Sequence, residues 1–87
     1  GEKKKFNSPV LVAISDNLHR IGFVTQEDMA SIGMPDYVAV YFPHSYNVSG
    51  NVFLVNREKV KPLTGVKNSE VMKFMVSGGV SSLEKTK

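Results

Sequence analysis

The sequence predicts a small α+β domain, in which a bent, mainly antiparallel sheet of about five strands packs on one C-terminal helix. Five short runs rich in β-branched and aromatic residues predict the strands. The connections between these runs are short, which favours antiparallel neighbours over parallel strands joined by crossover helices. Only one segment, near the C-terminus, has the apolar spacing of a helix.

The first two predicted strands form a hairpin. Residues 9–14 are a continuous apolar run, β-branched at three of six positions and too short for a typical helix, so we expect a strand covered on both faces. Residues 15–17 are turn formers, and a second strand follows at about residues 20–25. Gly22 inside this strand indicates either a bulge or a close approach of the backbone to its neighbours.

The middle of the chain contains the strongest strand signals. Between Thr25 and Pro35 we expect only one or two loose turns, because a cap and acidic residues are soon followed by helix breakers. Residues 37–42 then predict the clearest strand, and residues 51–55 the next. A short strand at residues 60–63 is expected at an edge of the sheet, because Pro62 has no N–H to donate to a ladder.

The helix is predicted from residue 68 or 69 to residue 77. The side chain of Asn68 or Ser69 can cap its first turn, and Glu70 suits the positive end of the helix dipole. One broad apolar face is formed by Val71, Met72, Met75 and Val76.

Four residues are expected to shape turns. Pro43 fixes φ and disfavours helix at the residue before it, while Gly50 permits a positive φ just before the next strand. Gly78 and Gly79 stop the helix and are not a phosphate-binding turn, because they follow a helix instead of opening one.

Composition restricts the function. A chain of 87 residues forms one domain, here expected over residues 9–80 with flexible tails at 1–8 and 81–87. The tails hold five of the eleven Lys and Arg residues, and between residues 6 and 83 six basic residues face six acidic ones. This near-neutral body weakens the case for nucleic-acid binding. The absence of cysteine excludes disulfides, thiolate catalysis and thiolate metal sites.

Five groups of residues, taken together and in order, resemble one protein family. They are Pro9-Val10-Leu11-Val12, Gly22-Phe23-Val24-Thr25, Val38-Ala39-Val40-Tyr41-Phe42-Pro43 with Ser49-Gly50 and Phe53-Leu54-Val55, Arg57-Glu58-Lys59-Val60, and Ser77-Gly78-Gly79-Val80. Over residues 8–82 the chain is similar to the soluble C-terminal domain of the continuous-vascular-ring-like integral membrane proteins, domain of unknown function family five hundred and two.

The resemblance implies a location more than an activity. Proteins of that family look like two N-terminal transmembrane helices followed by this domain, with no established enzymatic activity. The basic tail 1–8 would then follow membrane helices that lie outside this chain, and the domain would face the cytoplasm, as an excess of Lys near a membrane crossing favours. The family tends to carry a stiff Pro- and Thr-rich loop where this chain has the more flexible residues 43–50.

No enzymatic or metal chemistry is predicted. His44, Ser45 and Tyr46 could form a nucleophile and a base with Asp36, but neighbours in sequence seldom point together and no nucleophile elbow or oxyanion hole is evident. His19 and His44 are the only histidines, and neither has a second ligand at helical spacing. We therefore expect no catalytic residue, cofactor, metal or small-molecule substrate.

Two binding functions remain as alternatives. The first is a protein-interaction or self-association module that uses exposed sheet edges such as 60–63, or the surface of Met72 and Met75 where it is not core. The second is a small nucleic-acid-binding β-barrel, with a stacking platform of Tyr37, Tyr41, Phe42 and Phe53. Strand alternation argues against the platform, because one set of these side chains must face the core.

The candidate binding surface is the loop between the two strongest strands. His44, Ser45, Tyr46 and Asn47 have no evident core role, so we expect them to form an exposed binding surface, and we expect His44, Tyr46 and Asn47 to be dispensable for stability.

Overall fold

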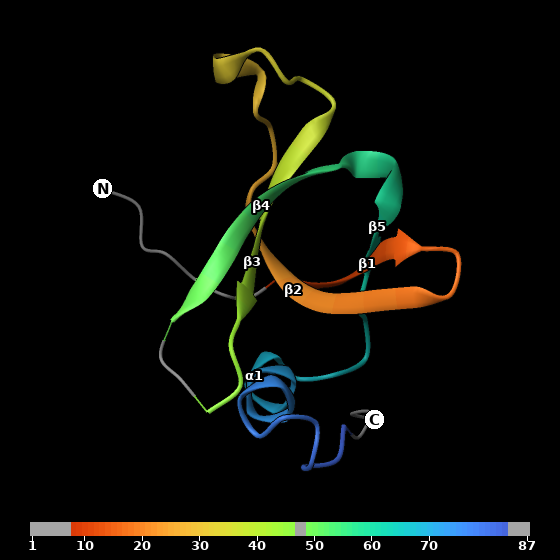
Figure 1. The fold of residues 1–87 in the computed structure, drawn as a ribbon, viewed down its shortest axis with the longest axis vertical. Helices are drawn as coiled ribbons and strands as arrows, with labels where there is room; N and C mark the ends of the chain where they lie inside the picture. Colours follow the sequence, from red (N-terminus) through yellow and green to blue (C-terminus); the bar gives the residue numbers. More distant parts are fainter. Residues whose placement is uncertain (1–7, 47–48, 84–87) are drawn as a thin grey trace.

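The computed structural model describes residues 8–46 and 49–83. Five strands form one sheet in the order β4-β3-β2-β1-β5, and every neighbouring pair is antiparallel (Figure 1). The strands are β1 Pro9–Ser15, β2 Leu18–Gln26, β3 Tyr37–Pro43, β4 Gly50–Asn56 and β5 Val60–Pro62. Two short 3-10 turns, η1 Ala30–Ile32 and η2 Arg57–Lys59, precede β3 and β5, and one helix, α1 Asn68–Val76, follows. The predicted α+β class is confirmed.

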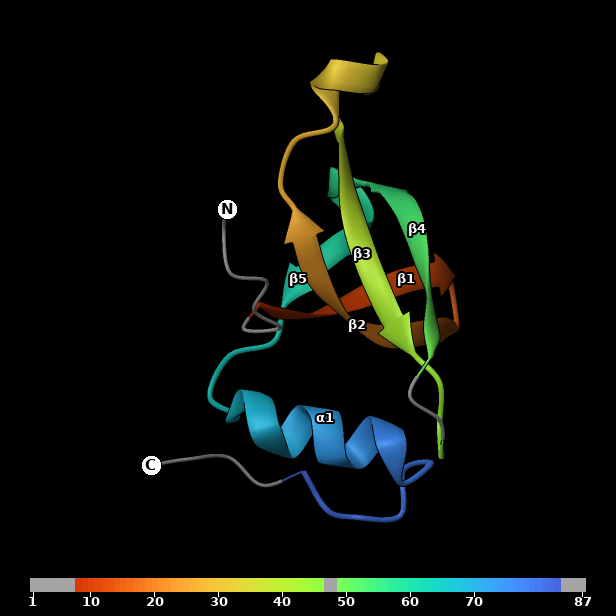
Figure 2. The same cartoon turned by 90° about the vertical axis from the view of Figure 1, so that its left-hand side faces the viewer.

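The sheet is strongly bent. Figure 2 shows β1 running across the direction of β3, with the long, curved β2 between them. The pairing register shifts between Ala13 and Ser15 in β1 and between Val24 and Gln26 in β2, and such irregularities increase local bend and twist. The bend folds one face of the sheet toward itself, which is how so small a sheet encloses a core.

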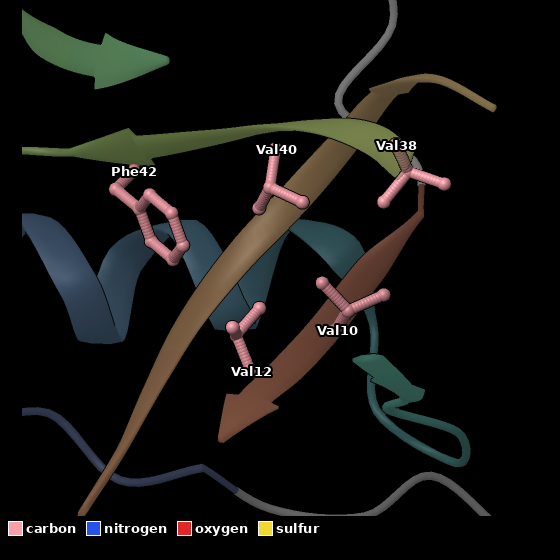
Figure 3. Close-up of a cluster of buried hydrophobic side chains, with 5 residues drawn as sticks. All are labelled: Val10, Val12, Val38, Val40 and Phe42. Atoms are coloured by element: carbon pink, nitrogen blue, oxygen red, sulfur yellow. The ribbon is translucent and has the colours of Figure 1, made fainter. Parts of the chain in front are cut away.

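The main core fills this concave face. Val10 and Val12 of β1 and Val38, Val40 and Phe42 of β3 are all buried and point toward one another (Figure 3). These two strands are not neighbours, since β2 lies between them. They meet because the residue of β2 between them is Gly22, which pairs with Val10 and carries no side chain.

The opposite face is covered at one end by α1. Phe23 pairs with Tyr41 and by strand alternation points away from the concave core, yet it is completely buried. Val71 of α1 is equally buried, and α1 lies beneath the sheet near β2 (Figure 2). Within β3 itself, Ala39 and Val40 face opposite sides of the sheet and both are buried.

Side chains of β3 approach the backbone of Gly22 so closely that this position requires glycine. A Cβ built there would lie 2.5 Å from Cγ1 of Val40 and 2.9 Å from the nearest Phe42 ring carbon. The sequence-based expectation of a close approach is confirmed, while the bulges lie elsewhere in the strands.

Two local expectations were wrong. Strand β1 is not covered on both faces, because Leu11 and Ala13 are half-buried and Ile14 is 48% exposed. The first turn of α1 has no side-chain cap, because Asn68 is already the first helical residue, which leaves Lys67 at the N-cap position with no side-chain hydrogen bond there. The edge position of β5 is confirmed.

The expected tails are only partly within the described residues. The carbonyl of Ser8 accepts a hydrogen bond from the N–H of Val24 at 3.0 Å, and the N–H of Ser81 donates to Oγ of Ser77 at 3.1 Å. Ser8 and Ser81 are therefore tied to the domain, whereas residues 1–7 and 84–87 lie outside the described part.

We expect Gly22→Ala to lower the free energy of unfolding by about 1–3 kcal/mol, the usual cost of overpacking a core. Because the new methyl would meet Cγ1 of Val40 first, the double variant Gly22→Ala, Val40→Ala should cost clearly less than the sum of its single variants. Urea unfolding of the four proteins measures both effects. If the costs of the two single variants simply add, a side chain at position 22 does not collide with Val40, and the explanation for Gly22 is wrong.

Candidate functional site

The candidate binding loop begins as a continuation of the β3–β4 ladder. Pro43 is buried at the end of β3, and the N–H of His44 donates to the carbonyl of Ser49 at 2.9 Å. The His44 ring lies across the base of the loop, with Nδ1 3.1 Å from Oγ of Ser49 and Nε2 3.2 Å from Nδ2 of Asn51. A ring with its proton on Nδ1 donates to Oγ of Ser49 and accepts from Nδ2 of Asn51, and these two contacts close the base of the loop.

Ser45 and Tyr46 bind the C-terminal end of α1. Oγ of Ser45 donates to the carbonyl of Met75 at 2.9 Å, and the N–H of Tyr46 donates to the carbonyl of Val76 at 2.7 Å. The Tyr46 hydroxyl donates to the carbonyl of Ser77, also at 2.7 Å. The last carbonyl groups of a helix have no partner within the helix, so three of them are satisfied here by a distant loop.

The glycines after the helix complete this arrangement. Gly78 and Gly79 have φ of 72° and 86°, and their N–H groups donate to Met75 and Phe74, as in left-handed helix stops. A Cβ at Gly78 would lie 3.1 Å from the Tyr46 ring, which rests against this turn. Tyr46 itself has φ of 55°, unusual for a residue with a side chain. The predicted role of both glycines is confirmed.

The loop is thus more structural than its sequence indicates. Ser45 and Tyr46 both hydrogen-bond to the end of α1, which argues against the expectation that Tyr46 is dispensable for stability. The Tyr46 side chain is nevertheless 76% exposed, so its outer surface is accessible. Asn47 lies outside the described residues.

Gly50 serves a different purpose from the one predicted. Its φ is not among the positive values found at four other glycines, so no left-handed conformation requires it. A Cβ at this position would lie 2.6 Å from the carbonyl oxygen of Phe42 and 2.7 Å from the Tyr41 ring. Gly50 is therefore needed because β3 and the Tyr41 ring approach its backbone closely.

The residues weighed for catalysis do not come together. Asp36 precedes β3 and His44 follows it, and a seven-residue strand separates them by roughly 20 Å or more. The carbonyl of Asp36 accepts the N–H of Arg57 at the far end of that strand. In the part of the chain that the structure describes, no three His, Cys, Asp or Glu residues gather as a metal site would need.

The four aromatic residues do not form a stacking platform. Phe42 is completely buried, with the Arg20 guanidinium 4.7 Å from its ring centroid. Tyr37 and Tyr41 are half-buried on β3. Phe53 alone is largely accessible, at 45%, and its ring packs against Phe42 at a centroid distance of 5.5 Å.

Strand β4 is the most exposed apolar element. It is an edge strand, and its side chains Val52, Phe53 and Leu54 are 59%, 45% and 37% exposed. Sequence reasoning predicted the strand but named only residues 60–63 as an edge. The missed signal is the run from Gly50 to Asn56, which contains neither a charge nor a proline.

Two further surfaces border the sheet. A groove of about 460 Å³ lies between β5 and the concave core, with Val10, Val38, Val60 and Leu63 among its lining residues. The Arg57 guanidinium at its rim donates to the carbonyl of Glu27 at 2.7 Å, which ties the chain around η1 to η2. On α1, Met72 and Met75 are half-buried, so they are neither fully core nor a free surface.

Comparisons with known proteins give one match. A family model described as "Protein of unknown function (DUF502)" matches residues 1–50, which include β1, β2 and β3. No curated protein and no solved structure matches the chain. Among the described residues, no helix has the length and apolar character needed to cross a membrane.

We expect Tyr46→Phe to lower the free energy of unfolding by about 0.5–1.5 kcal/mol, because it removes only the hydrogen bond to the carbonyl of Ser77. Tyr37→Phe is the matched control, since no hydrogen bond of the Tyr37 hydroxyl is found within residues 8–46 and 49–83. Urea unfolding compares the two variants. Equal stability of Tyr46→Phe and Tyr37→Phe would contradict a role for the loop in holding the helix.

Proposed function

Because the chain belongs to the DUF502 family, whose function is unknown, we propose that it is the soluble C-terminal domain of an integral membrane protein of the continuous-vascular-ring-like kind. In this proposal the domain faces the cytoplasm close to the membrane. It has no catalytic activity of its own and acts through protein contacts, including self-association.

The exposed apolar strand β4 carries this proposal. Three consecutive large apolar side chains, Val52, Phe53 and Leu54, are accessible to solvent on an edge strand. Unprotected edges of this kind pair readily with other chains, and natural proteins usually blunt them with charges or proline. A strand that is kept open and apolar therefore supports a role in binding protein.

The charge distribution supports the membrane-proximal placement. Lys3, Lys4 and Lys5 lie at the start of the chain, where the proposed membrane helices would precede it. Lys and Arg close to a membrane crossing favour the cytoplasmic side. The proposal of a non-catalytic role is supported by the separation of Asp36 from His44 along β3.

The cytoplasmic placement can be tested by labelling. Ser31 is exposed in η1, and the chain has no cysteine, so Ser31→Cys in the membrane-bound parent protein introduces one accessible thiol. We expect a membrane-impermeant maleimide to label this thiol only after the cells are permeabilised. The parent protein without the substitution gives the background. Labelling of the introduced thiol in intact cells would place the domain on the other side and contradict the proposal.

Nucleic-acid binding can be tested directly. Because the body of the chain is nearly neutral and Phe42 is buried, we expect only weak binding of single-stranded DNA or RNA. Moderate salt should abolish this binding, since it would depend on the basic tails. Fluorescence anisotropy at low and moderate salt measures it. Micromolar affinity that survives moderate salt would favour the nucleic-acid alternative instead.

A further inference from the structure

The hydrogen-bonding groups of β4 divide between two sides. The N–H of His44 donates to the carbonyl of Ser49, and the N–H of Arg57 donates to the carbonyl of Asp36, so both ends of the β3–β4 ladder have hydrogen-bonded pairs at odd-numbered β4 positions. In an antiparallel ladder, such pairs alternate with pairs whose N–H and C=O groups point outward. The outward-pointing groups of β4 therefore belong to Gly50, Val52, Leu54 and Asn56.

The other edge of the sheet offers no such donors. The N–H of Leu63 donates to the carbonyl of Pro9, so by the same alternation the outward positions of β5 are Val60 and Pro62. The N–H of Val60 donates to Arg57, and Pro62 has no N–H. Of the two edges, only β4 can donate to an added strand.

We propose that β4 pairs antiparallel with β4 of a second copy of this chain, about a twofold axis through Phe53. This inference rests on the proposed function and names the partner and the surface for self-association. With Phe53 opposite Phe53, Val52 lies opposite Leu54 and Gly50 opposite Asn56. All four outward residues of each strand are then used in hydrogen-bonded pairs, whereas a twofold shifted by one residue leaves one of them without a partner in the strand.

The side chains favour the same register. Phe53 lies on the core face, since it pairs with Val40 and packs against Phe42. In a non-hydrogen-bonded antiparallel pair the side chains lie closest, so two Phe53 rings would cover each other's exposed sides and join the two cores. On the other face, Val52 and Leu54 of one copy would pack on Leu54 and Val52 of the other.

Charge points to a second copy as the occupant. The seven residues of β4 carry no charge, and the nearest ones, on Arg57 and Glu58, lie beyond one end of the strand. The twofold places the Arg57 end of each strand against the Ser49 end of the other, so no like charges face each other. Because β5 cannot donate, the pairing closes as a dimer and does not extend into a fibre.

Crosslinking tests the register. Asn51 and Val55 would be opposite each other across the twofold, in a non-hydrogen-bonded pair with Cα atoms about 4.5 Å apart, within the range of a disulfide. We expect mild oxidation of a mixture of Asn51→Cys and Val55→Cys proteins to give disulfide-linked dimers that contain one of each. Either variant alone should give few linked dimers, because the same position in the two copies would be several residues apart along the paired strands.

A charge pair tests the same geometry without cysteine. Val52→Glu with Leu54→Lys places Glu opposite Lys twice across the twofold, whereas Val52→Lys with Leu54→Lys places Lys opposite Lys twice. Both replace the same exposed residues, so both should fold, which circular dichroism checks. We expect sedimentation to show a dimer for the first variant, and for the second a dissociation constant raised about tenfold or more.

The outcomes are distinct. A monomeric chain at millimolar concentration, or equal crosslinking of Ser31→Cys and the Asn51→Cys with Val55→Cys mixture, would overturn β4 pairing. Equal dissociation constants for the two charge variants would overturn it as well. None of these results bears on the membrane placement, which the maleimide labelling of the Ser31→Cys variant decides separately.

Discussion

The missing side chain of Gly22 is the constraint on which the sheet depends. Strands β1 and β3 are separated by β2, and their valines and Phe42 form one core only because nothing projects from β2 between them. Any Cβ there would meet Val40 at 2.5 Å. With the sheet bent over this point, one face encloses itself, and the small chain needs only one helix to cover part of the other. The position of Phe23 and the placement of α1 both follow from that division of the two faces.

A helix of nine residues with one completely buried side chain has little packing to hold it. The loop after β3 supplies the rest, because Ser45 and Tyr46 donate hydrogen bonds to the carbonyl groups at the end of the helix. This explains polar and aromatic residues in a loop that has no core to fill. It also explains why Tyr46 occupies a left-handed conformation, which orients both its N–H and its hydroxyl toward α1. The same residue leaves most of its ring accessible, so a structural role does not exclude a binding role.

Local signals in the sequence predicted the secondary-structure elements, but they could not predict contacts between residues that are far apart in the chain. The β-branched runs, Pro62 at the β5 edge and Gly78 with Gly79 after the helix each act within a few residues, and each was predicted correctly. The two hydrogen bonds of Tyr46 join residues 30 and 31 positions apart, and no spacing rule indicates them. Gly50 shows the same limit, because the sequence does not distinguish a glycine that is needed for close packing from one that is needed for a positive φ. The edge position of β4 also depends on the order of strands, which the sequence of elements did not specify.

The two edges of the sheet are unequal, and the proposed association depends on this asymmetry. Strand β5 is short, carries Pro62 and uses its remaining outward N–H within η2, so it ends the sheet. Strand β4 is seven residues long, uncharged and apolar. In free solution such a single edge contact would be weak, because association costs several kcal/mol of lost motion before any contact is gained. A chain held at a membrane, as proposed, meets other copies at a high effective concentration and in a restricted orientation, so that a weak edge contact suffices. Because only one of the two edges is open, this proposed contact stays a closed pair and does not extend from chain to chain.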